Sequence, residues 1–310
     1  MNWNGNNLNR QPWQAIHHAS PAITCYNTGV LRSDQITAAD LKSANSRRKG
    51  AIMTRLSPHP MPRRLVLLAP LAIGAVGRSA NGQAPAQEDP WPALSAQIFD
   101  GKTLQDGSAI LTIDAPYRAE DAALVPVGIR TQLPADDARS VRAVTLVIDE
   151  NPSPVAAVFS PGAASGMRLL STRVRVDSYT NVHAVAELSD GQLYATQRFV
   201  KAAGGCSAPA AKQEADSIPL GTMRFRQVPD GPGQDPERRE AQLMIRHPNY
   251  SGMQMDQVTR LYVPAHFVQT VHLWLGDTLL LGIESGISIS ENPVYRFDYH
   301  SNGATEFRAE

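Results

Sequence analysis

The residue best suited to covalent chemistry in this 310-residue chain is Cys206, one of only two cysteines, the other being Cys25. It follows Gly204 and Gly205 and precedes Ser207, and none of these neighbours has an apolar side chain that could bury a thiol. The two glycines give the backbone unusual freedom and let a partner approach closely. Because a thiolate is a strong nucleophile, the pattern predicts an exposed cysteine that reacts with or carries a group.

The cysteine lies in a segment, residues 202–217, that carries no large apolar side chain. Small, polar and proline-containing stretches of this kind are typical of flexible linkers. Lys201 and Lys212 flank the cysteine and favour its thiolate only weakly, since exposed charges are screened by solvent.

Strand signals dominate both sides of this linker, in residues 87–201 and 218–310. Apolar residues alternate with polar ones at short intervals, with Gly, Pro and Asp between the runs, which is typical of antiparallel β-sandwiches. In one run, Leu170, Thr172 and Val174 alternate with polar residues that include Arg175. Strands are expected at residues 108–114, 124–132, 142–150, 155–159, 170–176, 182–188, 192–201, 223–228, 241–246, 268–275, 278–283 and 294–299.

The expected fold is therefore all-β, with two antiparallel β-sandwiches joined by a flexible linker. A short helix is expected at residues 91–99, where Leu94 and Ile98 lie one turn apart. Apolar alternation in both halves is extensive, so we expect the halves to pack against each other through a sheet face.

Residues 61–86 have the layout of a signal peptide, with Arg63 and Arg64 before an apolar run and a small-x-small site ending at Ala86. The run of about a dozen apolar residues is too short to span a bilayer. Cleavage would leave one cysteine in a periplasmic protein with no membrane insertion, exported by the general secretory or the twin-arginine route. Residues 1–60 have little apolar periodicity, and we expect a disordered or misassigned upstream extension.

The composition excludes several other classes of function. The chain has 29 basic and 29 acidic residues, so no basic excess points to nucleic acid. Neither a glycine-rich phosphate loop nor a Gly-x-Ser-x-Gly elbow occurs. The histidines after residue 86 show no compact metal-ligand spacing, so neither a metal nor a cofactor is expected.

The end of the first half, Lys201 to Cys206, resembles the end of SoxY, the sulfur-carrying subunit of the periplasmic thiosulfate-oxidising system. The second half is similar to its partner SoxZ, in residues 245–248, 263–268 and 289–293. The order of the two in one chain resembles the fused SoxYZ-like carriers associated with quinoprotein dehydrogenases. The resemblance implies that the two antiparallel β-sandwiches are immunoglobulin-like. It also implies that Cys206 holds a sulfur intermediate covalently, with Gly204 and Gly205 as the hinge, while separate enzymes oxidise and hydrolyse it.

This chain differs from the two-subunit pattern after the cysteine, where Ser207 and Pro209 stand in place of trailing glycines and the chain continues. The thiol is therefore expected at the tip of a loop held at both ends. The chain also stops at Glu310, so the last strand is expected to be short.

The sequence thus predicts a carrier rather than an enzyme, with Cys206 as its covalent site. The implied partners are periplasmic redox enzymes of the cytochrome or quinoprotein dehydrogenase type, a sulfur-ester hydrolase, and a small sulfur-containing cargo. Two alternatives stay open at this point. One is an adaptor module for a quinoprotein dehydrogenase without covalent carriage, and the other is a dimer linked through the cysteine.

Overall fold

The structure is a computed structural model that describes residues 89–134, 136–209, 218–228 and 237–310. The expected upstream extension and signal peptide, residues 1–86, lie outside this part of the chain, as does the second part of the expected linker, residues 210–217.

The described residues form one helix and fourteen strands, which confirms the all-β prediction. The helix, α1, spans Trp91–Ile98, as the sequence predicts. The strands of the first half are β1 (Leu104–Asp106), β2 (Leu111–Asp114), β3 (Val125–Thr131), β4 (Val141–Ile148), β5 (Val155–Pro161), β6 (Leu169–Val174), β7 (Thr180–Leu188) and β8 (Leu193–Val200). Those of the second half are β9 (Met223–Val228), β10 (Arg238–Ile245), β11 (Thr270–Leu275), β12 (Thr278–Ser285), β13 (Val294–His300) and β14 (Phe307–Ala309).

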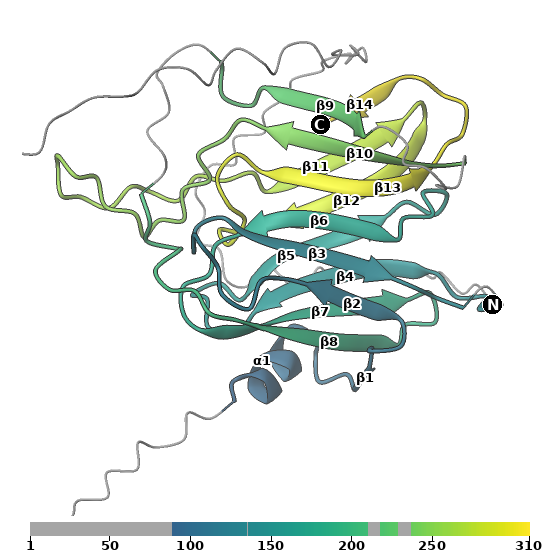
Figure 1. Ribbon diagram of the computed structural model, residues 1–310, viewed down its shortest axis with the longest axis horizontal. Helices are drawn as coiled ribbons and strands as arrows, with labels where there is room; N and C mark the ends of the chain where they lie inside the picture. The colour runs from purple at the N-terminus through teal and green to yellow at the C-terminus, as the bar shows by residue number, and fades with distance from the viewer. Residues whose placement is uncertain (1–88, 135, 210–217, 229–236) are drawn as a thin grey trace, which may run out of the picture. The chain divides into compact units, whose positions relative to one another are not determined.

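The strands form two sheets, and each half of the chain contributes to both. The eight-stranded sheet has the order β1-β8-β7-β4-β5-β12-β11-β14, and the six-stranded sheet has the order β2-β3-β6-β13-β10-β9. Every pair is antiparallel except β1 with β8, which is parallel. Figure 1 shows the strands of the first half, in blue to teal, followed along the layers by those of the second half, in green to yellow.

The expectation that the two sandwiches pack through a sheet face is wrong, because they join edge to edge. β5 pairs with β12 over five residue pairs, from Leu281 opposite Pro161 to Ser285 opposite Ala157. β6 pairs with β13 through Ser171 and Leu170. Edge strands carry unpaired backbone groups, and this arrangement lets each half satisfy the edge of the other.

The core lies between the two sheets and follows the predicted alternation. In β3 the buried residues are Val125, Val127, Ile129 and Thr131, with more exposed residues between them. One hydrophobic cluster runs through both halves, from Leu111 of β2 to Ala309 of β14. The two sandwiches therefore share one continuous core as well as their sheets.

Helix α1 is attached to the first half through an aromatic stack. The ring of Trp91 lies 3.5 Å from that of His183 on β7, at an angle of 3° between planes. His183 Nδ1 lies 2.9 Å from Asp149 Oδ1, and both side chains are buried. Figure 1 shows α1 beside β8 and β1. Within the described ranges, no helix is long and apolar enough to cross a bilayer.

Candidate functional site at Cys206

Cys206 is buried, with 0% of its surface exposed, so the prediction of a displayed thiol is wrong. It lies in a turn shortly after β8, and the preceding Lys201 forms a parallel bridge with Arg118. Residues 202–209 are therefore packed on the protein surface rather than extended as a free linker. The local residues are too small to bury a thiol by themselves, and its cover comes from distant parts of the chain.

The backbone around Cys206 is bound to the segment that connects β6 to β7. Gly204 N donates to Asp177 O at 2.8 Å, and Gly205 N donates to Val176 O at 2.9 Å. Arg175 Nη1 donates to Gly205 O at 3.2 Å. Three consecutive residues, Arg175 to Asp177, thus hold the two glycines that precede the cysteine.

The connecting segment is itself rigidly held. The side-chain amide of Asn151 donates to Arg175 O at 2.8 Å, and its carbonyl accepts from Asp177 N at 2.9 Å. Arg175 N donates to Ser288 O in the second half, also at 2.8 Å. Residues 175–177 form a platform beneath Cys206, and both halves of the chain hold this platform in place.

The second half also contacts the cysteine directly. The hydroxyl of Ser251, which is itself buried, donates to Cys206 O at 2.6 Å. The same hydroxyl lies 2.9 Å from Gln254 Oε1. Ser251 belongs to a long connection between β10 and β11, which is bridged at Tyr250 and His266. Cys206 therefore lies where the two halves meet.

Gly204 and Gly205 are needed here for two different reasons. Gly204 has φ +78°, a left-handed conformation that residues with a Cβ adopt only with strain. At Gly205 a Cβ would overlap Ala122 O and would lie 2.7 Å from Val176 O. Only glycine lets the backbone approach the platform this closely. The pair of glycines fits a packed position, and whether it also acts as a hinge stays a prediction.

Burial makes the thiol of Cys206 a poor nucleophile in this position. Desolvation raises its pKa from the ordinary 9.0 to about 12, and the nearby carboxylate of Asp177 adds to the increase. The positive charge of Arg175 acts in the opposite direction but is the weaker effect. At neutral pH the packed cysteine therefore holds roughly a thousandfold less thiolate than an ordinary one.

Sequence reasoning missed Arg175, which it placed on the polar side of an exposed strand. The side chain is fully buried, at 0% exposure. β6 ends at Val174, so the alternation no longer applies at the next residue. Burial lowers the pKa of the Arg175 guanidinium, while the negative charges of Glu291 and Asp121, and of Cys206 when it is a thiolate, act to raise it. The sequence offers no signal for this burial, because apolar and polar residues continue to alternate from Val174 to Asp177, past the end of β6.

Lys201 is not directed at the thiol. Its ammonium group lies 4.9 Å from the centre of the Tyr117 ring, over which it is placed. Lys212, the other candidate for favouring the thiolate, lies outside the described residues.

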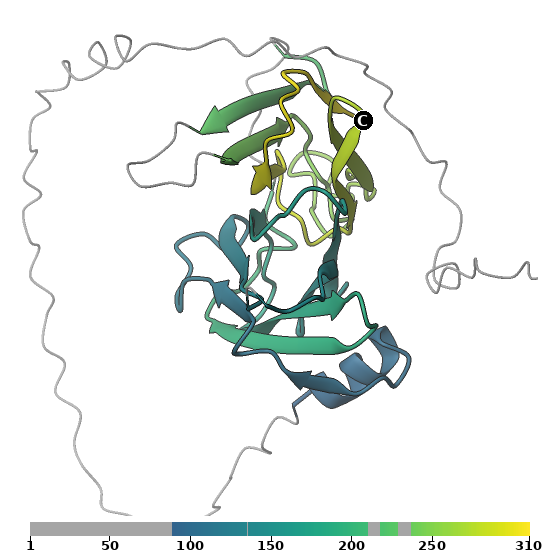
Figure 2. The same ribbon diagram turned by 90° about the vertical axis from the view of Figure 1, so that its right-hand side faces the viewer.

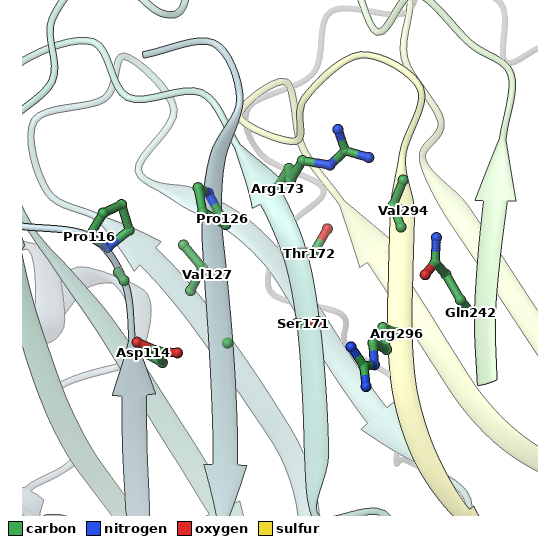
Figure 3. A pocket seen from close by; sticks show the side chains of 12 residues that line it. Asp114, Pro116, Pro126, Val127, Ser171, Thr172, Arg173, Gln242, Val294 and Arg296 are labelled. Carbon is green, nitrogen blue, oxygen red and sulfur yellow. The ribbon is translucent and has the colours of Figure 1, made fainter. Parts of the chain in front are cut away.

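A separate hollow of about 370 Å³ lies on the six-stranded sheet where the two halves join (Figure 3). Gly128 and Ser171 contribute to its lining, and the side chains of Arg173, Gln242 and Arg296 surround it. Cys206 does not line this hollow, so it gives no access to the thiol.

Comparison with protein families matches residues 95–206 to the family of the sulfur oxidation protein SoxY. Residues 231–310 match the family of the sulphur oxidation protein SoxZ. The SoxY match ends on Cys206 itself. The chain belongs to the fused SoxYZ-like proteins. This SoxYZ-like chain thus combines two components of sulfur oxidation in the order that the sequence predicts. The two are joined by the sheets, each of which runs through both halves of the chain.

Among solved structures, the sulfur carrier protein SoxY from Chlorobium limicola f thiosulfatophilum is 28% identical, with a TM-score of 0.30. That match covers 36% of this chain and 94% of the other. A superoxide reductase (neelaredoxin) from Ignicoccus hospitalis is 17% identical over 33% of this chain and 90% of its own, with a TM-score of 0.26. The curated proteins contain no match to the chain.

Proposed function

We propose that this SoxYZ-like protein is a periplasmic carrier that holds a sulfur-containing intermediate covalently on Cys206. The observation that carries the proposal is the SoxY match, which ends on Cys206 and is followed in the same chain by a SoxZ match. The sulfur carrier protein among the similar structures lends support to the role. The protein presents the cargo and does not itself oxidise or hydrolyse it.

Carriage requires that Cys206 leave its packed position. Four hydrogen bonds hold the segment, of which Arg175, Val176 and Asp177 make three and Ser251 makes one. Each contributes roughly 0.5–1.5 kcal/mol, so the packed state is favoured but can be displaced. Gly204 and Gly205 then serve as the hinge, and the thiol regains an ordinary pKa when it reaches solvent.

The packed state gives the empty carrier a protected thiol. An exposed free cysteine outside the cytoplasm is open to oxidation and unwanted disulfide formation. A thiol that is exposed only when the segment opens reacts mainly when a partner favours opening. The partners proposed here are periplasmic redox enzymes, of the cytochrome or quinoprotein dehydrogenase type, and a sulfur-ester hydrolase.

The connection that carries Ser251 also offers a contact surface for such partners. It exposes Val258, Leu261 and Tyr262 at 89%, 69% and 66%. Apolar side chains gathered on one exposed loop are typical of protein contact sites. A partner that binds this loop would act directly on the residue that holds Cys206.

A second function is favoured by the burial of Cys206. If the thiol is only a packing residue, the protein is an adaptor for a quinoprotein dehydrogenase that delivers a ligand without covalent bonds. Replacement of Cys206 by serine separates the two functions. In cells that oxidise reduced sulfur compounds, the carrier function predicts loss of sulfur-dependent electron transfer in Cys206→Ser, with the protein folded and present at normal levels. Full electron transfer in that variant would support the adaptor.

A further inference from the structure

The guanidinium of Arg175 has two N–H donors with no hydrogen-bond partner in the described part of the chain. They are Nε and Nη2, and both are buried. The third nitrogen, Nη1, donates to Gly205 O, the carbonyl immediately before Cys206. An unpaired buried donor costs about 1–3 kcal/mol, so two on one side chain call for an explanation.

The positions of the two donors on the guanidinium indicate what they could bind. Nε–H and Nη2–H lie along the same edge of the planar group and point in the same direction. This edge can donate two parallel hydrogen bonds to two oxygens of one anion, which is the arrangement found with carboxylates and phosphates. A sulfonate or a similar sulfur oxyanion presents the same pair of oxygens.

We propose that Arg175 binds the anionic, oxygen-bearing end of the group carried on Cys206. The inference rests on the proposed carrier function and adds to it the residue that recognises the cargo. The bond to Gly205 O holds the guanidinium beside the carrier segment when it is empty. When the cysteine is loaded, Nε and Nη2 donate to the oxyanion.

The charges around the site agree with an anionic cargo. Glu291 and Asp121 act on Arg175 through their negative charges, and Asp177 acts on Cys206. These carboxylates repel an anion unless a buried positive charge compensates for them. Arg175 supplies that charge, and a neutral cargo would gain less from it than an anionic one.

Two alkylating reagents of similar size test the inference on the full chain. Iodoacetate and iodoacetamide both transfer a two-carbon group to the sulfur of Cys206: the thiol loses its proton to solvent, and the resulting thiolate displaces iodide. One product is anionic and the other neutral. Peptide mass spectrometry measures the rate at Cys206 separately from that at Cys25. We expect the ratio of the iodoacetate rate to the iodoacetamide rate to fall about tenfold in Arg175→Gln, because a charged hydrogen bond contributes more than 1 kcal/mol.

Arg173 provides the matched control, since it lies two residues earlier and its side chain is exposed. Arg173→Gln removes the same charge and should leave the ratio within twofold of the unsubstituted protein. Arg175→Lys keeps the charge but not the two-donor edge, and should lie between the two. An unchanged ratio in a folded Arg175→Gln protein would overturn the inference.

A second measurement needs no variant and therefore does not depend on how Arg175→Gln folds. The carboxymethyl and carboxamidomethyl forms of Cys206 in the unsubstituted protein differ only in charge. If Arg175 binds the anionic end, the carboxymethyl form melts at a temperature equal to or higher than that of the carboxamidomethyl form. A lower melting temperature for the anionic form would contradict the inference.

These reagents do not depend on any natural cargo, so the inference and the carrier function can fail separately. If Cys206 reacts preferentially with the anionic reagent but carries no native sulfur adduct, Arg175 binds anions in a protein that is not a carrier. Native adducts without a charge preference would leave the carrier function and remove Arg175 from it.

Discussion

Replacing Gly205 by alanine should release Cys206 from its packed position. The added Cβ would overlap Ala122 O, and it would lie 2.6 Å from Ala122 C and 2.7 Å from Val176 O. All of these are backbone atoms, and Val176 N is bound to Ala122 O at 2.8 Å, so the platform cannot yield without losing its own bond. The segment must move instead, and the hydrogen bonds at Gly205 N and Gly205 O are lost with it.

The size of the effect follows from the pKa of the thiol. Packing raises that pKa from 9.0 to about 12, so release should increase the thiolate fraction near neutral pH by roughly a thousandfold. The assay is the rate of Cys206 alkylation by iodoacetamide at pH 7.5, followed by peptide mass spectrometry. In the unsubstituted protein, transient opening of the segment also lets Cys206 react, so the two alkylation rates differ by less than the thiolate fractions do. We expect Gly205→Ala to react at least about a hundredfold faster than the unsubstituted protein.

Two other glycines provide controls for this experiment. Gly204→Ala meets no atom within 4 Å but is strained at φ +78°, so we expect a smaller increase of about tenfold. Gly191→Ala has a similar strain at φ +80° in the turn between β7 and β8, at the other end of β8 from the cysteine, and should not change the rate. The reasoning is refuted if folded Gly205→Ala reacts within twofold of the unsubstituted protein.

Three further predictions concern the thiol, its contact with the second half, and the helix. Ser251→Ala removes the donor to Cys206 O and should speed alkylation about fivefold, whereas no change would show that the second half does not hold the segment. Because the folded pKa of Cys206 is raised, its contribution to stability is complete below the unfolded pKa near 9 and is lost as pH rises toward 12. Urea unfolding should therefore show a larger loss of stability from pH 8 to 10 in the unsubstituted protein than in Cys206→Ser, and equal losses would contradict the raised pKa. Trp91→Ala removes the stack on His183 and should lower the free energy of unfolding by about 2–4 kcal/mol in urea titration, while a loss below about 0.5 kcal/mol would show that α1 is not held by this contact.

The strands were predictable because alternation reports directly which side chains face a core. Runs of six to nine residues, such as β3 and β7, carry enough alternating positions to be recognised. β1 and β14 have three residues each, which is too few for a period of two to be seen.

The joining of the two halves was not predictable from alternation. The pattern assigns residues to faces, but it does not say which edge strand pairs with which. The contacts of β5 with β12 and of β6 with β13 connect residues that lie more than 100 positions apart. An extensive apolar pattern in both halves was interpreted as a shared face, whereas it reflects one core between two continuous sheets.

The burial of Cys206 was also not predictable from the sequence. Small residues around Cys206 predicted exposure, because local sequence contains nothing that could cover a thiol. The backbone of residues 204–206 is held by Arg175, Val176 and Ser251, and these contacts depend on the tertiary fold. Gly204 and Gly205 were predicted to be a hinge, which stays a prediction, and the structure shows them in close packing.

Native modification of Cys206 tests the central claim most directly. The protein should be purified from sulfur-oxidising cells without reductant, and the peptide that contains Cys206 analysed by mass spectrometry. The account predicts adducts on Cys206 that differ by whole sulfur atoms or by sulfur and oxygen, and that are removed by a reducing agent. A free thiol in every molecule, or only a disulfide between two copies of the chain, would contradict it.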